Sequence, residues 1–139
     1  MQRAIALVAA LGVMVPAGCG SSTADTAIRK TFESGVAQLS EPQTDKQLHD
    51  QVVRTLRRLR GERASTATGQ RAKTLAVRGF TWMLRGSKAR LDLTRNDSGN
   101  LEASVRDATR TDREMREGAR FIRAAGRALG ARVGELNGF

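Results

Sequence analysis

Apolar residues recur every three or four positions through most of this chain, which is the spacing of amphipathic helices. In residues 23–40 the apolar positions at this spacing are Ile28, Phe32, Val36 and Leu39. Pro42 disfavours helical geometry at the residue before it, Glu41. The pattern therefore predicts a first helix over residues 23–40.

Residues 44–61 have the same character. Thr44 and Gln47 stand at the spacing of a capping box, in which each side chain bonds the other residue's backbone N–H. Gly61 is a favourable residue for a helix end. The apolar stripe between these signals consists of Leu48, Val52, Leu56 and Leu59. We expect a second helix over residues 44–61.

Residues 62–69 are rich in small and polar side chains and predict a turn and the frayed start of a third helix, and residues 70–95 predict the long body of that helix. Its apolar arc is broad, so this helix is expected at the centre of the fold. Gly79 and Gly86 each cost about 1 kcal/mol of helix stability relative to Ala. We therefore expect another helix to approach closely at these glycines, with Trp82 in the core or half buried at an interface.

Residues 96–100, Asn-Asp-Ser-Gly-Asn, form the clearest turn signal. Asn100 is a good N-cap for a fourth helix, which the pattern extends to about Leu136. Along it runs a heptad seam, a stripe of residues repeating every seven positions. Its two rows are Leu101, Ala108, Met115, Ile122, Leu129 and Leu136, and Val105, Asp112, Ala119, Gly126 and Val133. Opposite charges four residues apart predict ion pairs on the outer face, between Glu102 and Arg106 and between Arg113 and Glu117.

Asp112 is the polar residue of this seam. As a functional residue it would be a buried acid, tuned by its surroundings for catalysis or ligand capture. As a structural residue it would pair with an arginine of the third helix or fix the register of the packing. We favour the structural role.

These elements predict an all-α fold: an up-and-down bundle of four unequal helices. At about 1.5 Å per residue the third and fourth helices would be roughly 40 and 55 Å long, and the short turn makes them antiparallel neighbours. The alternative is a long helical hairpin with two shorter helices that completes its core by dimerising.

The N-terminus has a different pattern. After Arg3, residues 4–15 are uniformly apolar or small, which is typical of a secretory signal peptide and too short for a membrane span of about 20 residues. The run leads into Ala17, Gly18 and Cys19, which resemble the lipobox of bacterial lipoproteins, although Pro16 stands where Leu is usual.

That resemblance implies cleavage before Cys19 and attachment of a diacylglycerol to its thiol, which would hold the chain at the extracytoplasmic face of the cell membrane. Two acyl chains suffice for stable anchoring. Cys19 is the one cysteine in the chain, so it has no disulfide partner within it. We expect a signal peptide over residues 1–18, a lipidated Cys with a short spacer over residues 19–23, and a basic helical domain over residues 24–139.

The formal net charge is +10, and it is concentrated in one segment. Residues 54–95 hold twelve Arg or Lys and two acids. Six arginines of this segment are candidates for binding phosphate or carboxylate groups: Arg54, Arg57, Arg58, Arg71, Arg78 and Arg85. The alternative is that they form only a solvated face.

Other chemistry has little support. One His, His49, and one Cys do not suffice for a zinc site or a Cys–His pair. His49 lies on a polar side of the second helix, where we expect it to be solvated. We predict no metal, no cofactor and no catalytic residue.

The stretch from Arg71 to Gly138 resembles small secreted or lipid-anchored proteins of high-GC actinobacteria, chiefly in residues 96–100 and 126–130. This implies a compartment and transfers no active site. We expect a non-enzymatic envelope lipoprotein whose partners are the membrane through its anchor and an anionic lipid, a wall polymer or an envelope protein, with a homodimer left open. The alternatives are a cytoplasmic nucleic-acid-binding protein, which the apolar N-terminus disfavours, and an enzyme that uses Asp112.

Overall fold

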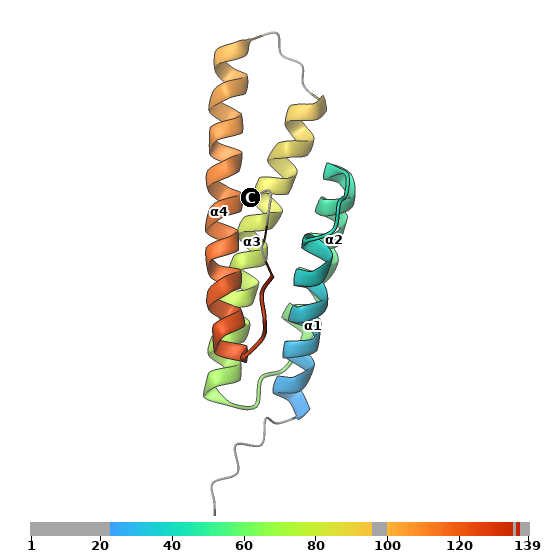
Figure 1. Ribbon diagram of the computed structural model, residues 1–139, viewed down its shortest axis with the longest axis vertical. Helices are drawn as coiled ribbons and strands as arrows, with labels where there is room; N and C mark the ends of the chain where they lie inside the picture. The colour runs from blue at the N-terminus through green and yellow to red at the C-terminus, as the bar shows by residue number, and fades with distance from the viewer. Residues whose placement is uncertain (1–22, 96–99, 135, 137–139) are drawn as a thin grey trace, which may run out of the picture.

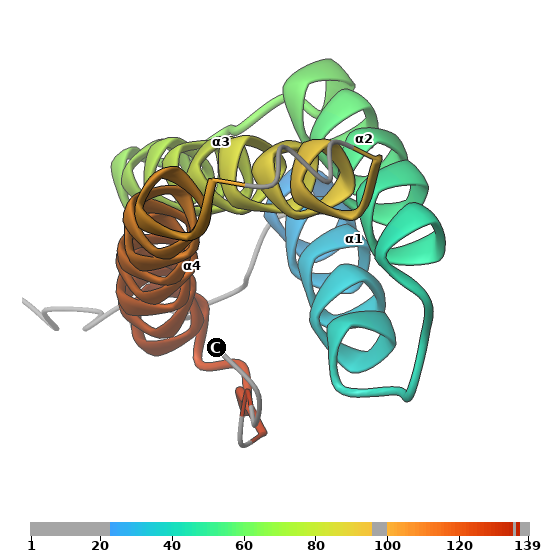
Figure 2. The same ribbon diagram turned by 90° about the horizontal axis from the view of Figure 1, so that it is seen from above.

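The computed structural model describes residues 23–95, 100–134 and 136, and it confirms the all-α, up-and-down bundle. Within these residues four helices alternate in direction, with α3 and α4 extending past α1 and α2 at one end (Figure 1). Seen from above, α3 lies between α4 and the α1–α2 pair (Figure 2). The predicted signal peptide, Cys19 and most of the turn at residues 96–100 lie outside the described residues.

The first two helices agree with the sequence pattern. α1 spans Thr23–Leu39 and α2 spans Asp45–Gly61. Thr44 caps α2 in a complete capping box with Gln47, as predicted. Their apolar stripes meet α3 in the core, where Phe32 of α1 and Phe80 of α3 pack edge to face with ring centroids 6.4 Å apart.

α3 spans Ala67–Arg95, so it begins three residues before the long helix expected from residue 70, within the segment expected to hold its frayed start. Thr66 explains the difference because its hydroxyl accepts a hydrogen bond from the Gly69 amide at 2.9 Å, which is an N-cap contact. The Asp25 carboxylate of α1 holds this turn by accepting from the Ser65 amide at 3.0 Å and from the Thr66 hydroxyl. A contact across forty residues of sequence therefore fixes where α3 starts.

α4 spans Leu101–Leu129, so the prediction that it continues to about Leu136 is wrong. Gly130 adopts the left-handed conformation with φ of 61°, and its amide bonds Arg127 while the Ala131 amide bonds Gly126. This pair of bonds is a Schellman motif, which ends the helix and turns the chain. The segment that follows returns to the bundle and buries Leu136 in the core.

The heptad seam is also wrong over the first half of α4. Leu101 is 78% exposed, Val105 is 57% exposed and Asp112 is exposed, whereas Thr111 and Glu114 are buried. A straight helix drifts by about 20° per heptad from an exact seven-residue repeat, so one strict repeat cannot face α3 along the whole length. Asp112 therefore does not interrupt a buried seam, and the structural role predicted for it there does not hold.

Glycines bring α3 and α4 together, as the sequence predicted for Gly79 and Gly86. A Cβ on Gly79 would lie 3.0 Å from the Ile122 amide nitrogen and 3.1 Å from the Gly118 carbonyl oxygen. Gly86 makes room for the Met115 side chain, whose Cγ would lie 2.7 Å from a Cβ at this position. The two backbones are nearly in contact here, and the α3–α4 interface is the most extensive in the bundle.

Candidate functional site

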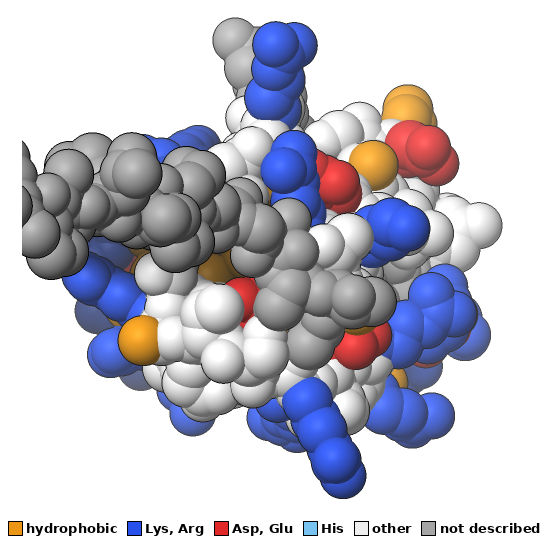
Figure 3. Space-filling view, turned by 90° about the horizontal axis from the view of Figure 1, so that it is seen from below, with side chains coloured by type: hydrophobic (Ala, Val, Ile, Leu, Met, Phe, Trp, Pro, Cys, Tyr) orange, Lys and Arg blue, Asp and Glu red, His pale blue; other side chains and the backbone are white. Residues whose placement is uncertain are grey.

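The six predicted arginines are all exposed, and the structure divides them between two helices. The α2 arginine cluster consists of Arg54, Arg57 and Arg58, which share the outer face of α2 at helical spacing. The α3 arginine row consists of Arg71, Arg78 and Arg85, which succeed one another at nearly two helical turns. Viewed along the bundle from the end where α1 begins, Lys and Arg side chains lie on several sides rather than in one patch (Figure 3).

Aromatic rings support the α3 arginine row. The guanidinium of Arg78 lies 4.4 Å from the centroid of Phe121 on α4, and that of Arg85 lies 5.0 Å from the centroid of Trp82. Trp82 is half buried, as predicted. Cation–π contacts of this kind contribute about 0.5–1 kcal/mol at exposed sites and restrict the side chain's orientation. These two guanidinium groups are therefore held in place while remaining accessible to a ligand.

The charges of the α3 arginine row are not balanced by ion pairs with nearby carboxylates among the described residues. Within the described part of the chain, no carboxylate lies at ion-pair distance from Arg71, Arg78 or Arg85. Arg78 further lines a hollow of about 380 Å³ with Arg60 and Lys73, where α3 passes the end of α2. The Lys73 ammonium donates to the carbonyls of Arg60 and Glu62, so its charge stabilises the C-terminal end of α2.

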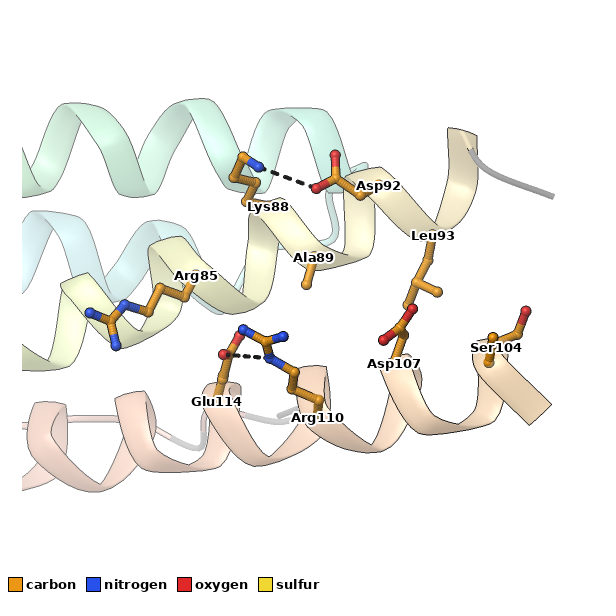
Figure 4. Close-up of a pocket in the computed structure, with 10 residues that line it drawn as sticks. Arg85, Lys88, Ala89, Asp92, Leu93, Ser104, Asp107, Arg110 and Glu114 are labelled. Carbon is orange, nitrogen blue, oxygen red and sulfur yellow. Dashed lines mark hydrogen bonds and ion pairs between the residues drawn. The ribbon is translucent and has the colours of Figure 1, made fainter. Parts of the chain in front are cut away.

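A larger charged cleft, of about 600 Å³, opens between α3 and α4 towards their free ends. Its lining carries both signs of charge: Arg85, Lys88, Asp92, Asp107, Arg110 and Glu114. Lys88 pairs with Asp92 at 3.3 Å and Arg110 pairs with Glu114 at 3.3 Å, while Leu93 and Asp107 point towards each other (Figure 4). With these charges largely matched, the cleft has no strong preference for an anion.

Glu114 is the buried acid of α4, and sequence reasoning missed it. Glu114 is 7% exposed, and its carboxylate accepts a hydrogen bond from the Arg110 guanidinium one turn earlier. The signal was available, since Arg110 and Glu114 are four residues apart on a helix. The expected ion pair of Glu102 with Arg106 is present, whereas Glu117 pairs with Arg120 at 2.9 Å and not with Arg113.

His49 is more involved in packing than predicted. It is half buried, and its Nδ1 lies 3.1 Å from the hydroxyl of Ser87 on α3. The same hydroxyl lies 3.1 Å from the Leu84 carbonyl oxygen, to which it can donate. Ser87 is completely buried, which leaves it inaccessible as a nucleophile. The pair is an α2–α3 contact.

Two carboxyl groups have lowered pKa values. The hydrogen bonds from Thr66 and Ser65 lower the pKa of Asp25, because they stabilise its charged form. A hydrogen bond from Lys46, 2.8 Å away, lowers the pKa of Asp50. The Asp25 carboxylate supports the start of α3, and the Asp50 carboxylate belongs to an ion pair within α2. Among the described residues, no group of three or more His, Cys, Asp or Glu side chains is arranged to hold a metal ion.

Comparison of the chain with protein-family models, curated proteins and solved structures gave no significant match. In the part of the chain described, none of the helices is long and apolar enough to cross a membrane.

Proposed function

We propose that the protein is a non-enzymatic lipoprotein of the cell envelope, attached through Cys19 to the extracytoplasmic face of the membrane, which binds an anionic partner on the α3 arginine row. The observation that carries the binding role is that Arg71, Arg78 and Arg85 are aligned, exposed and without carboxylate partners among the described residues. The lipobox-like sequence Ala17-Gly18-Cys19 supports the anchor.

The geometry of the row suits a repeating anion. Successive arginines are about 10 Å apart along the axis of α3, at about 1.5 Å per residue. Each guanidinium can donate two parallel hydrogen bonds to one phosphate or carboxylate group. An extended polymer with regularly placed phosphate groups, such as an anionic wall polymer, would engage all three at once.

The anchor is tested by the intact mass of the membrane fraction after expression of the full chain in a Gram-positive host. A chain beginning at Cys19 and carrying a diacylglyceryl group, with the modification lost in Cys19→Ser, is the expected result. A soluble, unprocessed chain would contradict the envelope location and direct the search for partners to nucleic acid in the cytoplasm.

The binding role is tested separately with inorganic polyphosphate as the probe. Arg71→Gln/Arg78→Gln/Arg85→Gln should weaken binding by at least tenfold, because it removes the row with its aromatic support. The matched control is Arg54→Gln/Arg57→Gln/Arg58→Gln, which removes the same charge from the outer face of α2. Equal losses in the two variants would show a response to net charge alone and would reject the row as a site.

A further inference from the structure

A second basic surface lies on α4, outside the six arginines that the sequence singled out. All seven arginines of this helix are exposed, and each follows the previous one by three or four positions. We call this set the α4 arginine stripe: Arg106, Arg110, Arg113, Arg116, Arg120, Arg123 and Arg127. Residues at this spacing share one face of a helix, and the stripe is roughly 31 Å long at about 1.5 Å per residue.

The stripe lies on the side of α4 opposite its packing face. Met115, Ile122 and Ala125 are at most 2% exposed and join the core, while the arginines alternate with them half a turn away. The stripe therefore forms an outer edge of the bundle along α4, which stands at one side of the molecule in Figure 2.

Most of the stripe is not neutralised. Glu102, Glu114 and Glu117 pair with Arg106, Arg110 and Arg120. In the described chain, no carboxylate lies at ion-pair distance from the other four, which are Arg113, Arg116, Arg123 and Arg127. Near the first half of the stripe, Arg106, Thr109, Arg110, Arg113 and Arg116 frame an open hollow of about 540 Å³.

Exposed aliphatic side chains adjoin one end of the stripe. Leu101 and Val105 are the large hydrophobic residues most exposed in the described part of the molecule, at 78% and 57%. Val105 lies eighteen residues before Arg123, which is five full helical turns, so the two share an angular position on α4. Val105 therefore lies at the edge of the arginine face. Leu101, one turn earlier, lies eighteen residues before the buried Ala119, so it stands beside Val105 on the packing side of α4, where it is left uncovered.

We infer that this outer face of α4 binds the surface of an anionic lipid bilayer, with the arginines on the phosphate groups and with Leu101 and Val105 entering the boundary between headgroups and acyl chains. Basic residues combined with exposed aliphatic ones are the pattern of helices that lie in a membrane interface. A soluble polyanion would satisfy the arginines and leave the aliphatic side chains in water. The inference takes from the proposed function only that a membrane is nearby, and it does not depend on the α3 arginine row.

Contact with the bilayer along α4 would fix the orientation of the bundle. The helices would lie roughly parallel to the membrane plane, with α4 against it and the α1–α2 pair away from it (Figure 2). The anchor would then supply attachment, and the α4 arginine stripe would supply orientation.

The test uses the full chain carrying Cys19→Ser, sedimented with vesicles of phosphatidylcholine alone or with 30% phosphatidylglycerol. Neutral vesicles measure any binding by the apolar N-terminal segment, which all variants share. Each arginine at an anionic surface is worth about a fivefold change in affinity, so Arg113→Gln/Arg116→Gln/Arg123→Gln should lose on the order of 100-fold on anionic vesicles. Binding should also weaken with added salt, because the charges are screened.

Two further variants decide between explanations. Arg54→Gln/Arg57→Gln/Arg58→Gln, with the same charge loss, should lose less than about tenfold, since the α2 arginine cluster would not touch the bilayer. Leu101→Ser/Val105→Ser should weaken vesicle binding severalfold and leave its salt dependence unchanged. All the substituted residues are exposed, and circular dichroism melting curves check that the variants stay folded.

Equal losses from the α2 and α4 arginine variants would overturn the inference in favour of diffuse charge attraction. Unchanged binding by Leu101→Ser/Val105→Ser, together with full displacement by polyphosphate, would overturn it in favour of a polymer site. Failure of the proposed function is distinguishable, because Arg71→Gln/Arg78→Gln/Arg85→Gln would then leave polyphosphate binding intact while vesicle binding still responded to the α4 variant.

Discussion

The α3–α4 interface is tightly packed over one half of its length and separated over the other half. Where the pair joins α1 and α2, Gly79, Gly86 and Gly118 bring the two backbones nearly into contact. Towards the free end, charged and polar residues such as Asp107 and Arg110 replace them, and the helices part around the charged cleft. We call the tightly packed half, around Gly79 and Gly118, the sealed half, and the half around the charged cleft the open half.

The difference shows what glycine and charge each do to an interface. Glycine removes the side chain that would hold two helices at the usual 8–10 Å, and tight packing offsets its cost in helix stability. A buried charge needs a partner and some access to water, so it favours separation. The amino acid at each facing position therefore decides whether the helices meet.

The largest effect should come from adding the same side chain to each half. A Cβ on Gly118 would lie 3.0 Å from the Gly79 carbonyl oxygen and 3.1 Å from the Met83 amide nitrogen, so Gly118→Leu must push the backbones apart. We expect a loss of about 3 kcal/mol in the free energy of unfolding by urea. Ala103→Leu is the control, because Ala103 lines the charged cleft, and its effect should stay within about 0.5 kcal/mol. Similar losses in both variants would show that the halves are equally packed.

A smaller loss in the free energy of unfolding should follow from shortening Leu136, whose side chain packs into the core of the sealed half. It is 3% exposed and joins the buried cluster that contains Ile28 and Phe32. Leu136→Ala should cost about 2–3 kcal/mol in the same measurement, as for other buried leucines. The matched exposed residue is Leu101, and a cost for Leu101→Ala as large as for Leu136→Ala would mean that α4 is buried differently from the structure.

Two acids of the open half should differ more modestly. Glu114 is buried and paired, so Glu114→Gln should lose about 1 kcal/mol after allowance for the exposed Arg110. Asp112 is exposed, so Asp112→Asn should change the unfolding free energy by less than about 0.5 kcal/mol. The opposite ranking would restore Asp112 to the packed face of α4.

The smallest effect should be a dependence on pH of the stability of the start of α3, where Asp25 supports the first turn. The pKa of Asp25 lies below its ordinary value of 3.8 because Thr66 and Ser65 donate hydrogen bonds to it. Its contribution to stability is therefore complete above pH 3.8 and disappears as the pH falls below that value, through the folded-state pKa. Amide exchange at the start of α3 should accelerate over this range in the wild type, and Asp25→Asn should abolish the pH dependence there.

Local patterns in the sequence predicted the helices but not their exact relations. The Thr44–Gln47 capping box, the Asn100 cap and the Gly79 and Gly86 contacts involve neighbouring residues or a single periodicity, and all were confirmed. The start of α3 has a local signal in the spacing of Thr66 and Gly69, whereas the support of this turn by Asp25, forty residues away, depends on the fold. The end of α4 at Gly130 is not evident from the sequence, because the apolar repeat continues through it to Leu136.

In the candidate surfaces too, features set by neighbouring residues could be predicted from the sequence, whereas contacts between helices could not. The six arginines are exposed, and the predicted helices already divide them between α2 and α3. The ring beneath Arg85 is also local, because Trp82 stands three residues earlier on α3, whereas the ring beneath Arg78 belongs to Phe121 of α4 and depends on tertiary packing. The α4 arginine stripe was visible in the sequence as spacings of three and four. The five acids of α4 keep its net charge low, so the charge distribution along the sequence does not reveal the stripe.

The reversal of the chain at Gly130 has a consequence for the order of folding. Few residues separate the end of α3 from the start of α4 in the sequence, so their contacts close a small loop at low entropic cost. The segment that carries Leu136 joins a core cluster with Ile28 and Phe32, and nearly the whole described chain lies between them. Contacts of such long range generally form late. Leu136→Ala should therefore accelerate unfolding in stopped-flow measurements and leave the refolding rate nearly unchanged. The segment that carries Leu136 would then be the last part of the chain to pack during folding and the first to detach during unfolding.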